Sequence, residues 1–97
     1  MRKLPIYKYL DISTAHITKE TDEFILKQLS RKTEGLLIIY DTGYGYFINV
    51  PYNLDEIEMH IPNDLASCLG FAKKHSCRWL LLDCYADVVD ELEQFEW

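Results

Sequence analysis

The feature that most constrains the fold is a pair of apolar segments separated by a turn in the middle of the chain. Residues 36–40 read LLIIY, and residues 44–50 read YGYFINV. Short runs rich in β-branched and aromatic residues are typical of strands, and the DTG sequence at 41–43 is typical of a turn. The pattern therefore predicts a β-hairpin. Because its first strand is continuously apolar, we expect that strand to be buried on both faces.

Two more strands and two helices are predicted around this hairpin. Residues 6–12 form the first strand, and Thr18 caps the helix that follows it. A second helix begins near residue 62, and residues 78–84 form the last strand. The apolar stripe expected on this second helix consists of Leu65, Cys68, Leu69 and Ala72. Residues 52–61 are predicted to be a loop, because their apolar spacing fits both a short strand and one helical turn.

The order of these elements, β-α-β-β-α-β, predicts a single α+β domain over residues 1–97. This is the order of the ferredoxin-like fold, a four-stranded antiparallel sheet with two helices on one face. An acidic C-terminal segment, residues 84–97, follows the last strand. The other face of such a sheet is left for this segment, a ligand or a partner chain. A homodimer is therefore one of the assemblies that we expect.

The cysteine and hydropathy patterns indicate a cytoplasmic chain without a metal or cofactor. Cys68, Cys77 and Cys84 are odd in number and form no CxxC pair, which argues against a disulfide framework and a zinc site. A hydrophobic content of 48% is enough for a core that needs neither. No apolar run approaches the roughly 20 residues of a membrane span. No apolar stretch follows the basic start of the chain either, so we expect no signal peptide.

The charges divide the chain into two parts. Residues 1–32 carry seven basic and four acidic side chains, whereas residues 33–97 carry three basic and twelve acidic ones. Phosphate groups are held mainly by Lys and Arg, so this distribution disfavours nucleic acid and favours a protein partner with a basic surface. We therefore expect a non-enzymatic protein-binding module. Its expected contact residues are Asp87, Asp90, Glu91, Glu93 and Trp97, with Tyr44 and Tyr46 as aromatic anchors.

A small hydrolase or a metal-dependent nuclease is the first alternative. In the hydrolase hypothesis Ser13 is the nucleophile, His16 its base and Asp83 the group that orients the imidazole. In the nuclease hypothesis Asp11 binds a metal ion, since residues 9–13 resemble the start of small ferredoxin-like nucleases of the CRISPR adaptation type. The competing structural interpretation is that Ser13 bonds to the loop backbone, His16 packs locally and Asp11 is solvated.

An RNA-binding module is the second alternative. Residues 42–49 partly match the RNP1 pattern of RNA-recognition motifs, and residues 6–10 lie where the RNP2 pattern would be. Tyr44 and Tyr46 would then stack on bases. However, residues 33–72 contain no Lys or Arg to hold phosphates. The competing interpretation is that the hairpin aromatics form cross-strand pairs and cover the sheet.

Three segments carry a resemblance to a family. They are LDISTAH at 10–16, YFINVP at 46–51, and a terminal pattern of Leu80, Leu82, Asp83, Val88, Val89, Asp90, Leu92, Phe95 and Trp97. Together they resemble an uncharacterised family, a domain of unknown function in small acidic bacterial proteins that are often carried on plasmids and prophages. Glu93 departs from the pattern, because the family often has proline there. By analogy with other small acidic proteins of mobile elements, the resemblance implies a regulator or an inhibitor of a host defence protein.

Overall fold

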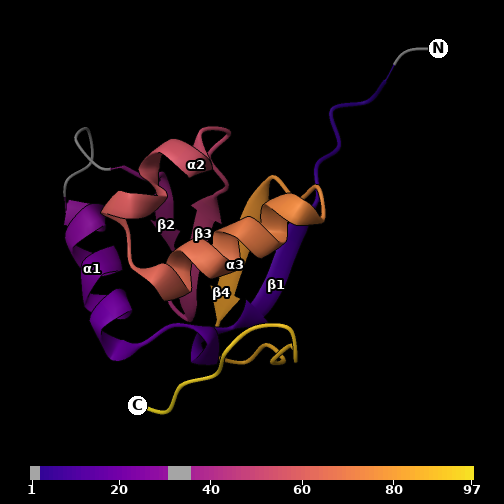
Figure 1. The fold of residues 1–97 in the computed structure, drawn as a ribbon. Coiled ribbons are helices and arrows are strands. Elements are labelled where there is room, and N and C mark those ends of the chain that lie inside the picture. The colour runs from indigo at the N-terminus through magenta and orange to yellow at the C-terminus, as the bar shows by residue number, and fades with distance from the viewer. Residues whose placement is uncertain (1–2, 31–35) are drawn as a thin grey trace.

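The fold is known from a computed structural model that describes residues 3–30 and 36–97 (Figure 1). The strands are β1 (Tyr9–Ser13), β2 (Ile39–Asp41), β3 (Gly45–Asn49) and β4 (Trp79–Asp83). The helices are α1 (Lys19–Ser30), α2 (Leu54–Ile57) and α3 (Asn63–Lys74), with 3₁₀ turns η1 (Thr14–His16) and η2 (Glu58–His60). The predicted α+β class is confirmed, and the predicted hairpin is the β2–β3 pair.

The sheet is mixed, and the prediction of an antiparallel sheet is wrong. Its strand order is β1-β4-β3-β2. The strand β3 runs antiparallel to both of its neighbours, but β1 and β4 are parallel, with Tyr9 opposite Trp79 and Ser13 opposite Asp83. The ferredoxin-like arrangement is therefore not confirmed.

The path between β3 and β4 explains this difference. Asn49 at the end of β3 pairs with Trp79 at the start of β4, so the connection returns to the end of the sheet that it left. Residues 52–61, predicted to be a loop, instead contain α2 and η2. These two elements carry the chain away from that end, and α3 brings it back (Figure 1). The extra helical pass makes β4 antiparallel to β3 and places it beside β1.

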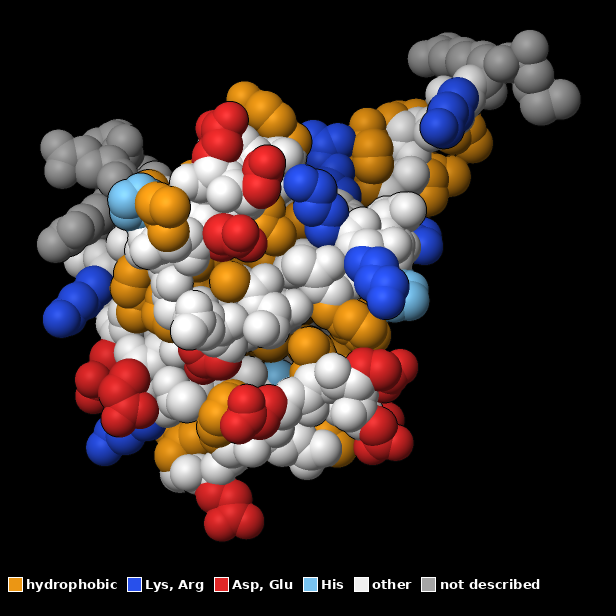
Figure 2. Space-filling model, in the orientation of Figure 1, with side chains coloured by type: hydrophobic (Ala, Val, Ile, Leu, Met, Phe, Trp, Pro, Cys, Tyr) orange, Lys and Arg blue, Asp and Glu red, His pale blue; other side chains and the backbone are white. Residues whose placement is uncertain are grey.

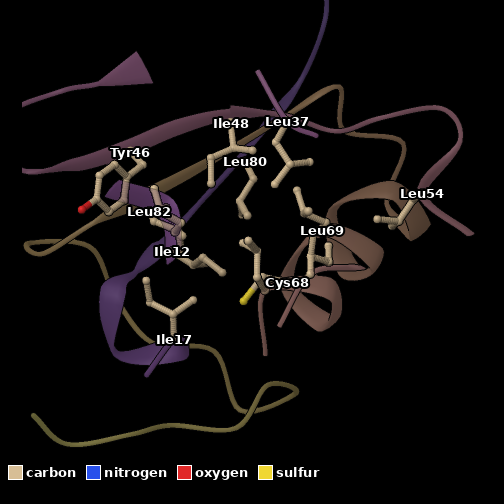
Figure 3. Packing of buried hydrophobic residues seen from close by; sticks show 13 residues of the cluster. Ile12, Ile17, Leu37, Tyr46, Ile48, Leu54, Cys68, Leu69, Leu80 and Leu82 are labelled. Atoms are coloured by element: carbon tan, nitrogen blue, oxygen red, sulfur yellow. The ribbon is translucent and has the colours of Figure 1, made fainter. Parts of the chain in front are cut away.

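The core lies between α3 and the inner side of the sheet (Figure 3). The inward side chains of the strands, Ile12, Ile48, Leu80 and Leu82, have no exposed surface. The predicted stripe of α3 is confirmed, since Leu65, Cys68, Leu69 and Ala72 are all buried. Full burial of an aliphatic side chain contributes about 1.5–3 kcal/mol. This layer therefore supplies much of the free energy that fixes β1 and β4 side by side.

The outer side of the sheet presents aromatic side chains to solvent. Strand register places Tyr9 and Trp79 in one row on this side, and Tyr40, Phe47 and Leu81 in the next. The rings meet in series, with centroid separations of 6.0 Å from Tyr9 to Phe47, 4.5 Å from Phe47 to Trp79 and 6.2 Å from Trp79 to Tyr40. We call these five residues the aromatic face.

The prediction that the first hairpin strand is buried on both faces is therefore wrong. β2 is an edge strand, and Tyr40 is 58% exposed on the aromatic face. Ile38, just before β2, is also exposed, whereas Leu37 is buried in the core. A continuous apolar run shows that the side chains are hydrophobic, but it does not predict which of them pack against another layer of the fold.

Candidate functional site

The C-terminal segment, residues 84–97, lies across the end of the sheet at which β1 and β4 finish (Figure 1). It leaves β4 through a tight turn, in which the backbone N–H of Tyr85 donates to Asp83 Oδ1 and that of Ala86 donates to the Asp83 carbonyl. From there it passes below η1. We call this segment the tail.

His16 holds the tail in place with both nitrogens of its ring. The backbone N–H of Val89 donates to His16 Nε2 at 2.9 Å, and His16 Nδ1 lies 2.9 Å from the Glu93 carbonyl oxygen. Because Nε2 accepts a hydrogen bond, the ring proton is on Nδ1, which donates to that carbonyl. The side chain is only 1% exposed. His16 is thus a buried bridge between two points of the tail backbone.

Three further hydrogen bonds fix the tail along its length. The Ser13 N–H donates to the Asp87 carbonyl at 3.0 Å, and the Phe95 N–H donates to the Ala15 carbonyl at 2.7 Å. The indole N–H of Trp97 donates to the Ile17 carbonyl at 2.8 Å. Val89 and Leu92 pack against the core cluster from the tail side. The tail is therefore a bound part of the domain, held at intervals from its start to its last residue.

The acids of the tail point away from the body. Asp87, Asp90, Glu91, Glu93 and Glu96 are all exposed, and residues 84–97 contain no Lys or Arg. We call these five residues the acidic tail surface. In Figure 2 acidic side chains lie over the lower end of the molecule, where the tail runs in Figure 1, and also over the upper end near α2, whereas Lys and Arg lie mostly toward the upper right. The side chain of Trp97 is 58% exposed at the end of this surface.

A hollow lies beside the last residues of the tail. It has a volume of about 530 Å³, and its walls come from η1, the start of the tail and the end of the tail. The lining residues are Ser13, Thr14, Ala15, Cys84, Phe95, Glu96 and Trp97. A carboxylate and an indole ring therefore border one cavity, a combination suited to a cationic side chain.

The residues of the hydrolase hypothesis lie at the same end of the sheet, but each is engaged elsewhere. Ser13 and Asp83 are register partners, and η1 places His16 nearby. However, Ser13 Oγ accepts from the Ala15 N–H, Asp83 Oδ1 accepts from the Tyr85 N–H, and both His16 nitrogens bond to the tail. Ser13 thus bonds to the loop backbone, whereas His16 bonds to a distant segment and does not pack only locally, as the structural interpretation had it. The nuclease residue Asp11 is exposed on the outer side of β1.

No group of three or more His, Cys, Asp or Glu side chains in residues 3–30 and 36–97 is arranged to hold a metal ion. The three cysteines are free thiols in different environments. Burial, with a smaller effect of the Asp64 charge, raises the pKa of Cys68 to about 12. Cys84 is exposed and lines the hollow beside the tail.

The two predicted aromatic anchors differ in exposure to solvent. Tyr44 is exposed and packs against Tyr85, with ring centroids 5.5 Å apart. Tyr46 points into the core, and its hydroxyl donates to Asp22 Oδ1 at 2.6 Å. Burial and this hydrogen bond raise the pKa of Tyr46 above its usual range. Tyr46 is therefore neither a surface anchor nor a base-stacking residue, because its place in β3 directs it to the inner side of the sheet.

The sequence model of one family, described as the C-terminal domain of a family of unknown function (DUF5983), matches residues 9–97. The chain belongs to this family. No curated protein and no solved structure matches the chain. The DUF5983 match begins with β1 and extends through Trp97, so it includes the sheet, α3 and the tail.

The match to the DUF5983 domain covers both ends of the contacts that hold the tail. The η1 segment with His16 and the tail segment with Val89 both lie within it. The aromatic face extends beyond the hairpin aromatics expected to cover the sheet, because it also includes Tyr9 of β1 and Trp79 of β4. The alternation of side chains along β3 could have predicted this face, because Phe47 points to the side of the sheet opposite to that of its neighbours Tyr46 and Ile48.

None of the helices in the described ranges has the length and apolar character that a membrane span requires.

Proposed function

We propose that this domain is a non-enzymatic protein-binding module, and that its acidic tail surface recognises a basic surface on another protein. The observation that carries the proposal is the way in which His16 and the neighbouring backbone hold the tail. Asp87, Asp90 and Glu91 then occupy fixed positions on the domain. A preorganised surface loses little conformational entropy on binding, so more of the interaction free energy contributes to affinity.

Electrostatics favours a protein partner over a nucleic acid. The tail surface would repel phosphates, and a basic protein surface would be attracted from a distance. Exposed charges more than about 8 Å apart are largely screened at physiological ionic strength, so the association should weaken as salt rises. The hollow beside Glu96 and Trp97 offers a place for one Lys or Arg side chain of the partner.

The test is binding of a fluorescent Lys- and Arg-rich peptide to the full chain at low and high salt. Neutralising the tail with Asp87→Asn, Asp90→Asn and Glu91→Gln should weaken binding. Each exposed ion pair contributes about 0.2–1 kcal/mol, so the combined loss should be roughly 3- to 150-fold in affinity. A single-stranded oligonucleotide of similar length should not bind.

A matched control is available on the helices. Asp55→Asn, Glu56→Gln and Glu58→Gln remove the same charge from three exposed residues of α2 and η2. This variant should bind the peptide as well as the unchanged protein does. Equal weakening by both triple variants would show a response to net charge alone and would contradict a specific tail surface.

The family resemblance suggests the class of partner, a host defence protein that the module regulates or inhibits. This part of the proposal rests on analogy with small acidic proteins of mobile elements. It is tested by co-expressing the chain with nuclease-based defence systems and measuring phage infection. Protection by the defence system should fall with the unchanged chain and should remain with the tail-neutralised variant. If both chains lowered protection equally, the inhibition would not depend on the acidic tail surface, and this part of the proposal would be wrong.

A further inference from the structure

We propose that the aromatic face and the N-terminal arm, residues 3–8, form a homodimer interface in which the arm of each copy lies along the aromatic face of the other. This surface is distinct from the acidic tail surface. It consists of residues that the proposed function does not use.

The aromatic face is the first half of the argument. Phe47 and Trp79 stack with an angle of 4° between their ring planes, and Tyr9 and Tyr40 extend this stack to the two edge strands. Tyr9 and Tyr40 remain 54% and 58% exposed. The register places the polar side chains of Asn49 and Asp11 in the same rows, at the border of these rings. An exposed apolar patch with polar side chains at its border often marks a site that another surface covers.

The arm is the second half. It continues from β1 and projects away from the body (Figure 1). Leu4, Ile6 and Tyr7 are 62%, 76% and 59% exposed, although all three are apolar in character. The Arg78 guanidinium lies over the ring of Tyr7, with its central carbon 4.2 Å from the ring centroid. This contact holds the part of the arm nearest β1 beside the start of β4. An extended segment with these side chains gains stability by packing on a second apolar surface.

The charges select a second copy as the occupant. Residues 1–8 contain three basic and no acidic side chains. On the outer side of the sheet, Asp11 lies in the middle of β1, opposite Leu81, and Asp83 lies at the end of β4. A twofold axis beside Tyr9, perpendicular to the strands, would place each arm antiparallel over β1 of the second copy. Each arm, with Lys3 and Lys8, would then approach the carboxylates of the other copy.

The size of the surfaces explains why the arm must take part. Three strands have five residues and β2 has three. With strands about 4.8 Å apart and a rise of about 3.3 Å per residue, the face measures about 290 Å². Specific interfaces bury about 800 Å² on each partner. The sheet alone is therefore too small for a stable dimer. An arm of six residues, about 20 Å long when extended, enlarges the contact on both copies.

Sedimentation of the full chain tests this inference. The unchanged protein should sediment as a dimer at micromolar concentration. Tyr40→Lys, on the aromatic face, and Ile6→Lys, on the arm, should each shift the equilibrium to monomer, with a dissociation constant raised at least tenfold. The control is Tyr52→Lys, at a residue 92% exposed outside the aromatic face and the arm, which should leave the dimer intact. Circular dichroism confirms that each variant folds.

Charge reversal gives an independent readout. Lys3→Glu with Lys8→Glu should weaken the dimer, because like charges would then meet at Asp11 and Asp83. A monomeric unchanged protein would overturn the inference, and so would a dimer that survives both Tyr40→Lys and Ile6→Lys. Neither result would affect the proposed function, since the Tyr40 and Ile6 variants keep the acidic tail surface and should bind the basic peptide normally.

Discussion

His16 shows how one buried side chain can fix a long irregular segment. Replacing it with alanine would remove its hydrogen bonds to Val89 N–H and the Glu93 carbonyl, and would leave a cavity under the tail. Unpaired buried polar groups cost about 1–3 kcal/mol each. We expect His16→Ala to lower the free energy of unfolding by about 2–4 kcal/mol, measured by urea denaturation. Trp97 fluorescence should also change, because the indole is held beside the same segment.

The control for this prediction is His60→Ala. His60 is exposed on η2, so its replacement should change stability by less than about 0.5 kcal/mol. A His16→Ala protein as stable as this control would show that the tail does not depend on the ring. The sequence left the role of His16 open, since its partners are backbone groups 73 and 77 residues away. Backbone donors and acceptors leave no trace in the identity of the residues that carry them.

Two glycines provide a second test at the residue scale. A Cβ added to Gly45 would lie 1.7 Å from the carbonyl oxygen of Leu82 and 2.7 Å from its carbon, both backbone atoms of the adjacent strand. We expect Gly45→Ala to destabilise the protein by about 2 kcal/mol or more, because β3 and β4 must separate. A Cβ on Gly70, within α3, would have no neighbour within 4 Å.

Gly70→Ala should therefore raise stability by about 0.5–1 kcal/mol, since alanine is the better helix former. Thermal unfolding of the two variants should show shifts of opposite sign. If the two shifts had the same sign, either the close approach of β3 to β4 or the open surroundings of Gly70 would be wrong.

At the scale of elements, Asp64 joins the beginnings of two helices. It lies in the first turn of α3, yet its carboxylate accepts from the Thr18 N–H at 2.7 Å and from the Thr21 hydroxyl at 2.6 Å, at the start of α1. Hydrogen bonds to charged groups contribute about 1.5–3 kcal/mol. We expect Asp64→Ala to lower the free energy of unfolding by about 2–3 kcal/mol in urea. Asp55→Ala, at an exposed residue in the first turn of α2, is the control and should have little effect.

Local patterns predicted elements well and their arrangement poorly. The stripe from Leu65 to Ala72 and the cap at Thr18 both depend on near neighbours, and the structure has both. The parallel pairing of β1 with β4 depends on whether the connection crosses the domain once or twice. That in turn depends on residues 52–61, whose apolar spacing fits a strand as well as a helix. The ambiguity of this one segment is thus the reason that the predicted topology of the sheet was wrong.

At the scale of the whole molecule, the charge asymmetry was readable from composition, but the path of the tail was not. Counting charges located five acids and no Lys or Arg in residues 84–97. Only the folded chain brings that segment against η1 and separates the acidic tail surface from the aromatic face. Charge is a sum over residues, whereas a surface requires tertiary contacts between distant segments.

Alkaline pH should destabilise the molecule through two buried groups. Burial raises the pKa of Cys68 from 9.0 to about 12, and burial with the Asp22 hydrogen bond raises that of Tyr46. Both groups keep their protons in the folded state at pH values where the unfolded chain releases them. The stabilisation is complete below about pH 9 and is lost as pH rises toward 12. Each such proton contributes a slope of at most about 1.4 kcal/mol per pH unit.

Urea unfolding at a series of alkaline pH values measures this slope. Cys68→Ala and Tyr46→Phe lower stability overall. However, Cys68→Ala should make the decline above pH 9 shallower and Tyr46→Phe the decline above pH 10, because one raised pKa is absent in each. Cys84→Ala and Tyr52→Phe change exposed groups and should leave the slope as it is. Parallel curves for all five proteins would mean that neither buried group remains protonated in the folded state, and the packing of Cys68 against the sheet would then need revision.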